Sequence, residues 1–157
     1  MDQEAKASGE ALLQAWLSLT AVICNRRMVT GMTFNEAVVC NHLLHQQQRD
    51  PDHPLTATDL CEKTSLLKSQ MNQVLSSLER QGYVVRSRSR ADRRQVELQI
   101  TNAGQDAYRQ AHQNASALLC QLVERYGREA IDALSQQLNF VAADIQEIQD
   151  SRQKGTL

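Results

Sequence analysis

Residues 67–101 read LKSQMNQVLSSLERQGYVVRSRSRADRRQVELQIT, and this stretch decides the fold. Its first part predicts a helix from about Leu67 to Gln81, because four apolar residues recur at the spacing of one helical face: Met71, Val74, Leu75 and Leu78. Gly82 then supplies a stop signal. The opposite face carries amides, hydroxyls and cations but no acid: Lys68, Ser69, Gln70, Asn72, Gln73, Ser76, Ser77 and Arg80. Such side chains can donate to and accept from base edges, so this face is suited to reading DNA.

The second part of the stretch predicts a β-hairpin with a basic tip. One strand starts at Tyr83–Val85, and apolar and polar residues alternate in the second, from Gln95 to Thr101. Between them stand five arginines in nine residues: Arg86, Arg88, Arg90, Arg93 and Arg94. The 32 residues from Lys63 to Arg94 hold eight basic and two acidic residues, a net charge of +6 in a chain whose total is -1. A patch of this kind attracts a polyanion, although an arginine-rich surface can also be merely solvated.

Helical periodicity predicts five further helices on either side of this stretch. They are expected near residues 11–28, 33–48, 56–64, 101–126 and 130–148. Thr33 and Glu36 have the form of a capping box, and Gly127 separates the last two helices. The fold class expected is mainly α with a small β-hairpin wing (α+β), and 157 residues suit one domain.

Three motifs carry a resemblance to a known family: Leu78–Val84 (LERQGYV), Asp92–Arg94 (DRR) and Ile100–Gly104 (ITNAG). Together with the order of elements, they make the chain, from about Leu12 to Ile148, resemble the MarR-type (multiple antibiotic resistance regulator) winged helix-turn-helix transcription factors. Ile100 stands where the family usually has leucine, and Ser76-Ser77 where it often has a charged pair, which bears on the operator that is read. The resemblance implies a single MarR-like domain over 1–157, with a DNA-binding lobe at 33–101 and a helical dimerisation region at 9–30 and 102–150.

The resemblance also implies sequence-specific binding to double-stranded DNA, with the helix near residues 69–80 in the major groove. Arg94 is expected in the adjacent minor groove with Asp92 orienting it, unless Asp92 is only an internal counter-ion among the arginines. The expected DNA contacts are Lys68, Ser69, Gln70, Asn72, Gln73, Arg88, Arg90, Asp92, Arg93 and Arg94. The implied function is a regulator, expected to be a repressor, that binds a pseudo-palindromic operator as a homodimer.

The first helix and the two long helices after the hairpin carry more apolar surface than a small helix-turn-helix unit can cover. Alanines at every fourth position, such as Ala107, Ala111 and Ala115, would let another helix approach closely. A second copy of the chain is therefore expected to cover these helices in a two-fold dimer.

Release from DNA by an unidentified small molecule or a redox signal is expected from the resemblance. Trp16, Met28, Met32 and Phe34 could line an effector pocket, although apolar residues at helical spacing are usually core. Cys24 and Cys40 are the candidate redox residues, although cysteines are often simply buried. His42, His45 and His112 are weak metal candidates for a metal-responsive regulator of the same fold, and neither a cofactor nor a resident metal is predicted.

Other functional classes fit less well. The chain has no G-x-S-x-G elbow, phosphate-binding glycine loop or H-E-x-x-H, so an enzyme is not expected. RNA binding is not expected either, because no aromatic residues that could stack on bases stand among the arginines. A winged-helix interaction module without DNA binding stays open as the alternative. No apolar run approaches the length of a membrane helix and no signal peptide is evident, so a cytoplasmic protein without a membrane partner is expected.

Overall fold

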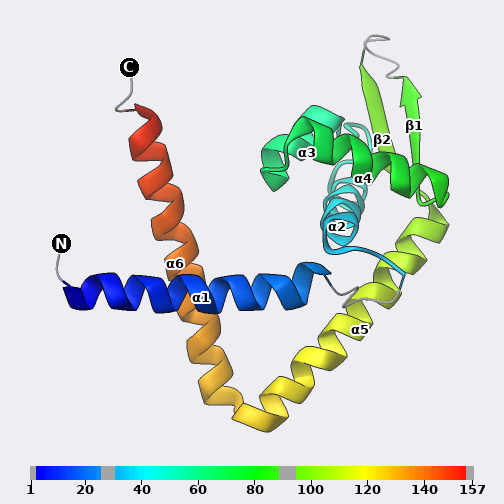
Figure 1. Ribbon diagram of the computed structural model, residues 1–157. Coiled ribbons are helices and arrows are strands. Elements are labelled where there is room, and N and C mark those ends of the chain that lie inside the picture. Colours follow the sequence, from blue (N-terminus) through cyan, green and yellow to red (C-terminus); the bar gives the residue numbers. More distant parts are fainter. Residues whose placement is uncertain (1–2, 26–30, 89–94, 155–157) are drawn as a thin grey trace. The chain divides into compact units, whose positions relative to one another are not determined.

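The computed structural model describes residues 3–25, 31–88 and 95–154. These residues form six helices and one hairpin (Figure 1). The elements are α1 (Gln3–Asn25), α2 (Phe34–Arg49), α3 (Ala57–Thr64), α4 (Lys68–Arg80), β1 (Val84–Arg88), β2 (Val96–Ile100), α5 (Asn102–Tyr126) and α6 (Arg128–Lys154). The expected fold class, mainly α with a hairpin wing, is confirmed.

The chain divides into two compact units, Met1–Ala115 and Ser116–Leu157, with the boundary inside α5. The first unit contains the segment predicted as the DNA-binding lobe. We call α2, α3, α4, the hairpin and α5 up to Ala115 the winged lobe. In the described part of the chain, no helix combines the length and hydropathy needed to span a membrane.

The winged lobe has its own apolar core, in which α2 packs against α3, α4 and β2. Its buried members come from every element of the lobe: Met32, Val39, Cys40, Leu43, Leu55, Leu60, Met71, Leu75, Leu78, Val84, Leu98, Ile100 and Ala111. Burial of this many apolar side chains is the main driving force that holds the recognition-type helix α4 in place.

Both helices that open the lobe begin with a capping box. At α2 the Thr33 N–H donates to Glu36 Oε2 at 2.7 Å, and the Glu36 N–H donates to Thr33 Oγ1 at 3.3 Å, as the sequence predicted. At α3 Thr56 and Asp59 make the same reciprocal pair. These bonds satisfy donors that have no partner within the helix, and they fix where each helix starts.

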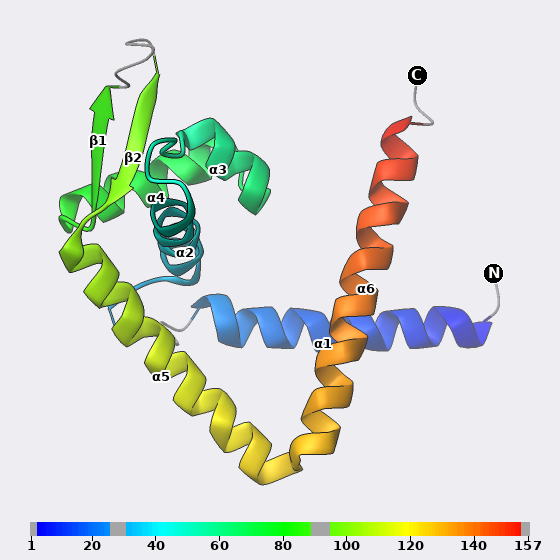
Figure 2. The same cartoon turned by 180° about the vertical axis from the view of Figure 1, so that it is seen from behind.

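The two strands pair antiparallel, with Val84 opposite Ile100 and Arg88 opposite Val96, and they lie side by side when seen from behind (Figure 2). The Leu98 N–H donates to the Leu55 carbonyl at 2.8 Å, and Thr56 forms a bridge with Glu97. The segment before α3 therefore pairs with the second edge of β2 and anchors the base of the hairpin to the helices.

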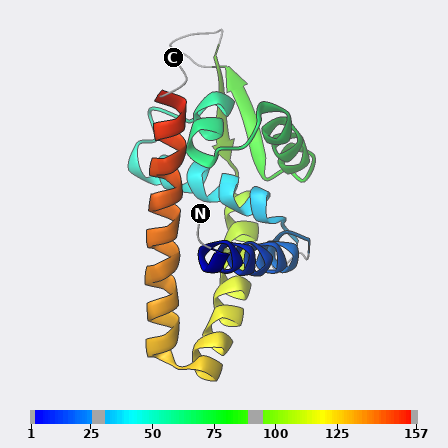
Figure 3. The same cartoon turned by 60° about the vertical axis from the view of Figure 1, so that its left-hand side comes forward.

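The junction between the hairpin and α5 is held by Thr101. Its N–H donates to the Tyr83 carbonyl at 2.9 Å, and its hydroxyl donates to the Gly82 carbonyl at 2.7 Å. The same hydroxyl accepts the Gly104 N–H at 3.0 Å, which caps the helix that leaves the base of β2 (Figure 3). A Cβ atom on Gly104 would lie 2.2 Å from the Tyr83 carbonyl oxygen, so only glycine allows this close approach.

Helices α1 and α6, which we call the outer helices, are less buried than the winged lobe. The first helix begins at Gln3, eight residues before the predicted start, because residues 3–10 favour helix but contain no large apolar residue to reveal a period. Of the described side chains of α1 and α6, none is buried. Their large apolar residues are instead exposed, among them Leu12, Trp16, Val22, Leu134, Leu138, Phe140 and Ile148.

Candidate nucleic-acid interface

The two faces of α4 differ as the sequence predicted. Met71, Leu75 and Leu78 are fully buried in the lobe core. The other face is exposed and polar, and it presents Lys68, Ser69, Gln70, Asn72, Gln73, Ser76 and Arg80. Because the buried face locks the rotation of the helix about its axis, the polar face is presented to solvent in a fixed orientation.

Gln70 has a structural bond that the sequence did not indicate. The Leu67 N–H donates to Gln70 Oε1 at 3.1 Å, and Leu67 at the N-cap has no side-chain acceptor of its own. Gln70, at the third position of α4, therefore supplies one of the two bonds of a capping box, and the bond from an N-cap side chain is missing. Its amide NH₂ group, a donor, is the part suited to an acceptor on DNA.

Ser77 differs from its predicted place on the polar face, because it is half-buried and belongs to a network between α2 and α4. Gln81 Nε2 donates to Ser77 Oγ at 3.3 Å and to Glu36 Oε1 at 3.1 Å. Burial alone would raise the pKa of Glu36, but hydrogen bonds from the Thr33 backbone and the side chains of Ser77, Thr33 and Gln81 outweigh it and lower the pKa. A buried, ionised Glu36 thus ties the start of α2 to the C-terminal end of α4.

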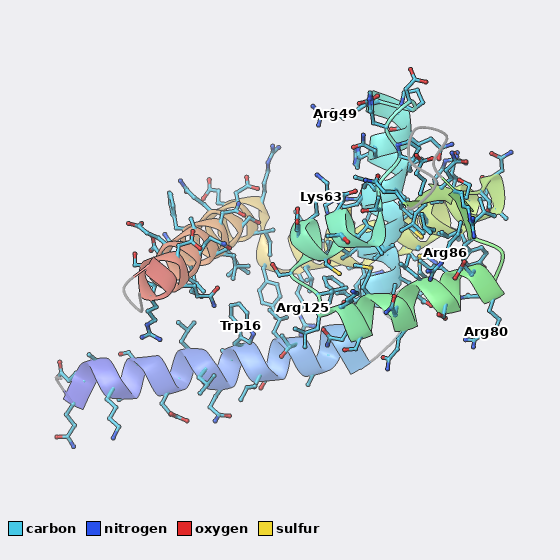
Figure 4. All side chains as sticks on the ribbon, turned by 90° about the horizontal axis from the view of Figure 1, so that it is seen from above. Trp16, Arg49, Lys63, Arg80, Arg86 and Arg125 are labelled. Atoms are coloured by element: carbon cyan, nitrogen blue, oxygen red, sulfur yellow. The ribbon has the colours of Figure 1, made fainter. Side chains whose placement is uncertain are left out.

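Basic side chains lie on three neighbouring elements of the lobe, and Figure 4 labels Lys63 on α3, Arg80 on α4 and Arg86 on β1. Arg86 is paired, since its Nε lies 2.9 Å from Glu79 Oε1. This ion pair joins the hairpin to α4, and the Glu79 carboxylate neutralises the charge of one arginine of the predicted basic patch. Arg88 is exposed at the end of β1, whereas Arg90, Asp92, Arg93 and Arg94 lie outside the described residues.

The candidate effector and redox residues differ in their exposure. Trp16 is exposed on α1 (Figure 4), and the side chain of Cys24 lies outside the described part. Met32 is a core residue, whereas Phe34 is exposed, and Met28 is not described. Cys40 is fully buried, and burial together with the nearby Glu36 carboxylate raises the pKa of its thiol to about 12. At neutral pH Cys40 is therefore a thiol, which is the unreactive form.

One of the three candidate histidines is half-buried, and the other two are exposed. His42 is half-buried, and burial, Lys63 and His45 lower its pKa. His45 is exposed on α2, and His112 is exposed on α5 with its ring 6.0 Å from that of Tyr108. Within the described ranges, no three His, Cys, Asp or Glu side chains form a group that could hold a metal ion.

The sequence profile described as the MarR family matches residues 30–95, which cover most of the winged lobe. The resemblance to the MarR family is confirmed. No curated protein sequence gives a significant match. The family profile ends inside the hairpin, so it contains all of α4 and its polar face.

Solved structures extend the similarity to most of the chain. The transcriptional regulator BldR from Sulfolobus solfataricus is 18% identical, with a TM-score of 0.68 over 92% of this chain and 99% of that one. The S. aureus MepR–DNA complex is 14% identical, with a TM-score of 0.67 over 88% and 97%. The PcaV transcriptional regulator from Streptomyces coelicolor, in complex with its natural ligand, is 20% identical, with a TM-score of 0.63 over 91% and 96%.

These matches show a shared fold. BldR and PcaV are both described as transcriptional regulators.

Proposed function

We propose that the protein is a sequence-specific DNA-binding repressor that acts as a homodimer on a pseudo-palindromic operator. The observation that carries the proposal is the exposed polar face of α4, held in one orientation by the fully buried Met71, Leu75 and Leu78 beside a basic hairpin. The fold shared with MepR, which was solved in complex with DNA, supports it.

In this proposal α4 lies in the major groove. Asn72, Gln73 and the NH₂ group of Gln70 contact base edges, while Lys68 and Ser69 contact phosphates. Arg88, Arg90 and Arg93 add phosphate contacts, and Arg94 enters the minor groove with Asp92 beside it. The single chain is then one functional domain, with DNA recognition in residues 33–101.

The dimer is supported by the exposed apolar side chains of α1, α5 and α6, which belong to the predicted dimerisation region 9–30 and 102–150. Exposed apolar surface of this extent is unusual for a monomer. Two copies related by a two-fold axis would present two α4 helices to half-sites about one helical turn apart.

Release from DNA by a small molecule is also part of the proposal, and the PcaV complex with its natural ligand supports it. A redox signal through Cys40 is not proposed, because that thiol is buried and its pKa is raised to about 12.

The test is selection of binding sites from random duplex DNA at physiological salt. Wild-type protein is expected to enrich an A·T-rich inverted repeat, whereas Arg94→Ala is expected to lose most of the enrichment. Arg109→Ala is the matched control, because Arg109 is exposed on α5 and paired with Asp106, and this variant should enrich the same sequence as wild type. Gln73→Ala should relax the preference at one position by about 1 to 3 kcal/mol if the contact is bidentate.

Failure of the wild-type protein to enrich any sequence, with or without candidate small molecules, would contradict the proposal and favour the interaction-module alternative. Equal binding by wild type and Arg94→Ala across a salt titration would remove Arg94 from the mechanism while leaving α4 as the reader.

A further inference from the structure

Leu67 is out of place by the ordinary rules of helix termini. It occupies the N-cap of α4, with φ -63° and ψ 148°, where serine, threonine, asparagine or aspartate would cap the helix. It is also 68% exposed, the highest value among the large apolar residues that the structure describes. Leu67 thus neither caps the helix nor is buried in the lobe, so its side chain is accessible to a partner.

The turn that carries Leu67 is fixed. Ser65 adopts a left-handed conformation with φ 56°, and Leu66 is half-buried against the lobe core. The Leu66 N–H donates to Thr64 Oγ1 at 3.4 Å, and the Leu67 N–H donates to Gln70 Oε1 at 3.1 Å. With both backbone donors held and Leu66 turned inward, the Leu67 side chain is directed to solvent at the N-terminal end of the polar face.

The N-terminal residues of a recognition helix are those that contact base edges. The edges of the bases in the major groove present hydrogen-bonding groups and one apolar group, the C5-methyl group of thymine. Leucine has no hydrogen-bonding side chain, so the thymine methyl is the base-edge group that it complements. Its neighbours Lys68 and Ser69 are suited to phosphate and would hold this end of α4 against the DNA.

We propose that Leu67 packs against the methyl group of a thymine in each operator half-site and is a specificity-determining residue. This inference rests on the proposed function, because it requires that α4 enters the major groove. It adds an apolar contact to a face whose other members read by hydrogen bonds.

The experiment replaces each thymine of the selected operator in turn by deoxyuridine, which removes only the methyl group, and measures binding by fluorescence anisotropy. For wild type, one symmetric position should lower the affinity about fourfold per half-site, the value expected for one buried methyl group. Leu67→Ser should bind the thymine and deoxyuridine forms of that position equally. Serine is a favoured N-cap residue, so this variant should keep α4 folded.

Two further variants sharpen the comparison. Leu67→Met keeps an apolar side chain at the position and should keep most of the thymine preference. Leu119→Ala removes an exposed leucine from α5 and should keep the full wild-type ratio between the two DNA forms, even if its overall affinity changes.

The two proposals fail in different ways. If wild type binds the operator selectively but every effect of deoxyuridine is the same in Leu67→Ser, the thymine contact is wrong and the DNA-binding function stands. If wild type selects no DNA sequence at all, the proposed function itself is overturned.

Discussion

Leu75 and Leu138 are both leucines on the apolar faces of amphipathic helices, yet the first is fully buried and the second is 47% exposed. The contrast extends to the regions that hold them. Apolar residues of the winged lobe converge on one core, whereas those of α1 and α6 are exposed or half-buried in the single chain. The lobe therefore has a buried core of its own, whereas none of the described side chains of α1 and α6 is buried.

This difference assigns the two regions different sources of stability. Each large apolar side chain buried in the lobe contributes about 1.5 to 3 kcal/mol, whatever the protein concentration. Helices whose apolar faces stay in water gain little from packing and are marginal by themselves. If a second copy covers them, as proposed above, their stability depends on association and so on protein concentration.

The strongest test of this contrast is the pair Leu75→Ala and Leu138→Ala. Leu75→Ala leaves a cavity in the lobe core and should lower the free energy of unfolding by about 2 to 5 kcal/mol. Leu138→Ala should leave lobe stability almost unchanged and should instead weaken the proposed dimer. Urea unfolding at two protein concentrations, with sedimentation velocity for the oligomeric state, measures both effects.

The proposed difference in the source of stability would be wrong if Leu138→Ala lowered the unfolding midpoint as much as Leu75→Ala at every protein concentration and left the oligomeric state unchanged. That result would mean that α6 packs within its own chain and that its apolar face needs no second copy.

A second pair of variants replaces one glycine of the winged lobe and one glycine of α1 by alanine and compares the effects on stability. Gly104→Ala places a methyl group 2.2 Å from the Tyr83 carbonyl oxygen and 2.9 Å from Cγ1 of the Ile100 side chain. The Tyr83 backbone cannot move aside as a flexible side chain could, so a loss of about 3 kcal/mol is expected. Gly9→Ala in α1 meets no atom within 4 Å, and the higher helix propensity of alanine should stabilise that helix by up to about 1 kcal/mol. Thermal unfolding followed by circular dichroism measures both changes.

Equal tolerance of alanine at both positions would show that α5 can shift away from Tyr83. The close approach would then be a detail of packing and would not fix the start of α5.

The elements between Thr33 and Tyr126 were predictable to within three residues because their signals are local. Thr33 with Glu36, Gly82 after α4 and the alternation around Leu98 each act over a few residues of chain. The start of α1 was not predictable, because residues 3–10 carry no apolar period. A helical segment without a buried apolar face has no periodic pattern of apolar residues from which a sequence could predict it.

The candidate interface was only partly predictable, because some of its contacts join elements whose packing the sequence does not specify. The polar face of α4 follows from spacing alone. The ion pair between Arg86 and Glu79 and the bond from Gln81 to Glu36 depend on how the hairpin and α2 lie against α4. Cys40 shows the same limit, since its full burial and raised pKa come from the surrounding core.

The smallest effect expected concerns Glu36, which links α2 to α4. Glu36→Gln keeps the shape but removes the charge that accepts hydrogen bonds from Thr33, Ser77 and Gln81, so a loss of about 1 to 2 kcal/mol is expected at pH 7. The pKa of Glu36 in the fold is below its ordinary value of 4.5, so the carboxylate stabilises the fold above that pH, and this contribution is lost as the pH falls through the folded pKa. Urea unfolding from pH 7 to pH 3 should therefore show wild type and variant converging in acid.

Glu147→Gln on α6 is the matched control, because Glu147 is exposed and its replacement should change stability by less than about 0.5 kcal/mol at any of these pH values. A difference between wild type and Glu36→Gln that stayed constant down to pH 3 would mean that the loss of one acceptor oxygen, and not the loss of charge, weakens this site. Convergence in acid for Glu36→Gln, with no effect for Glu147→Gln, would show that the buried charge of Glu36 contributes to the stability of the lobe and that the exposed charge of Glu147 does not.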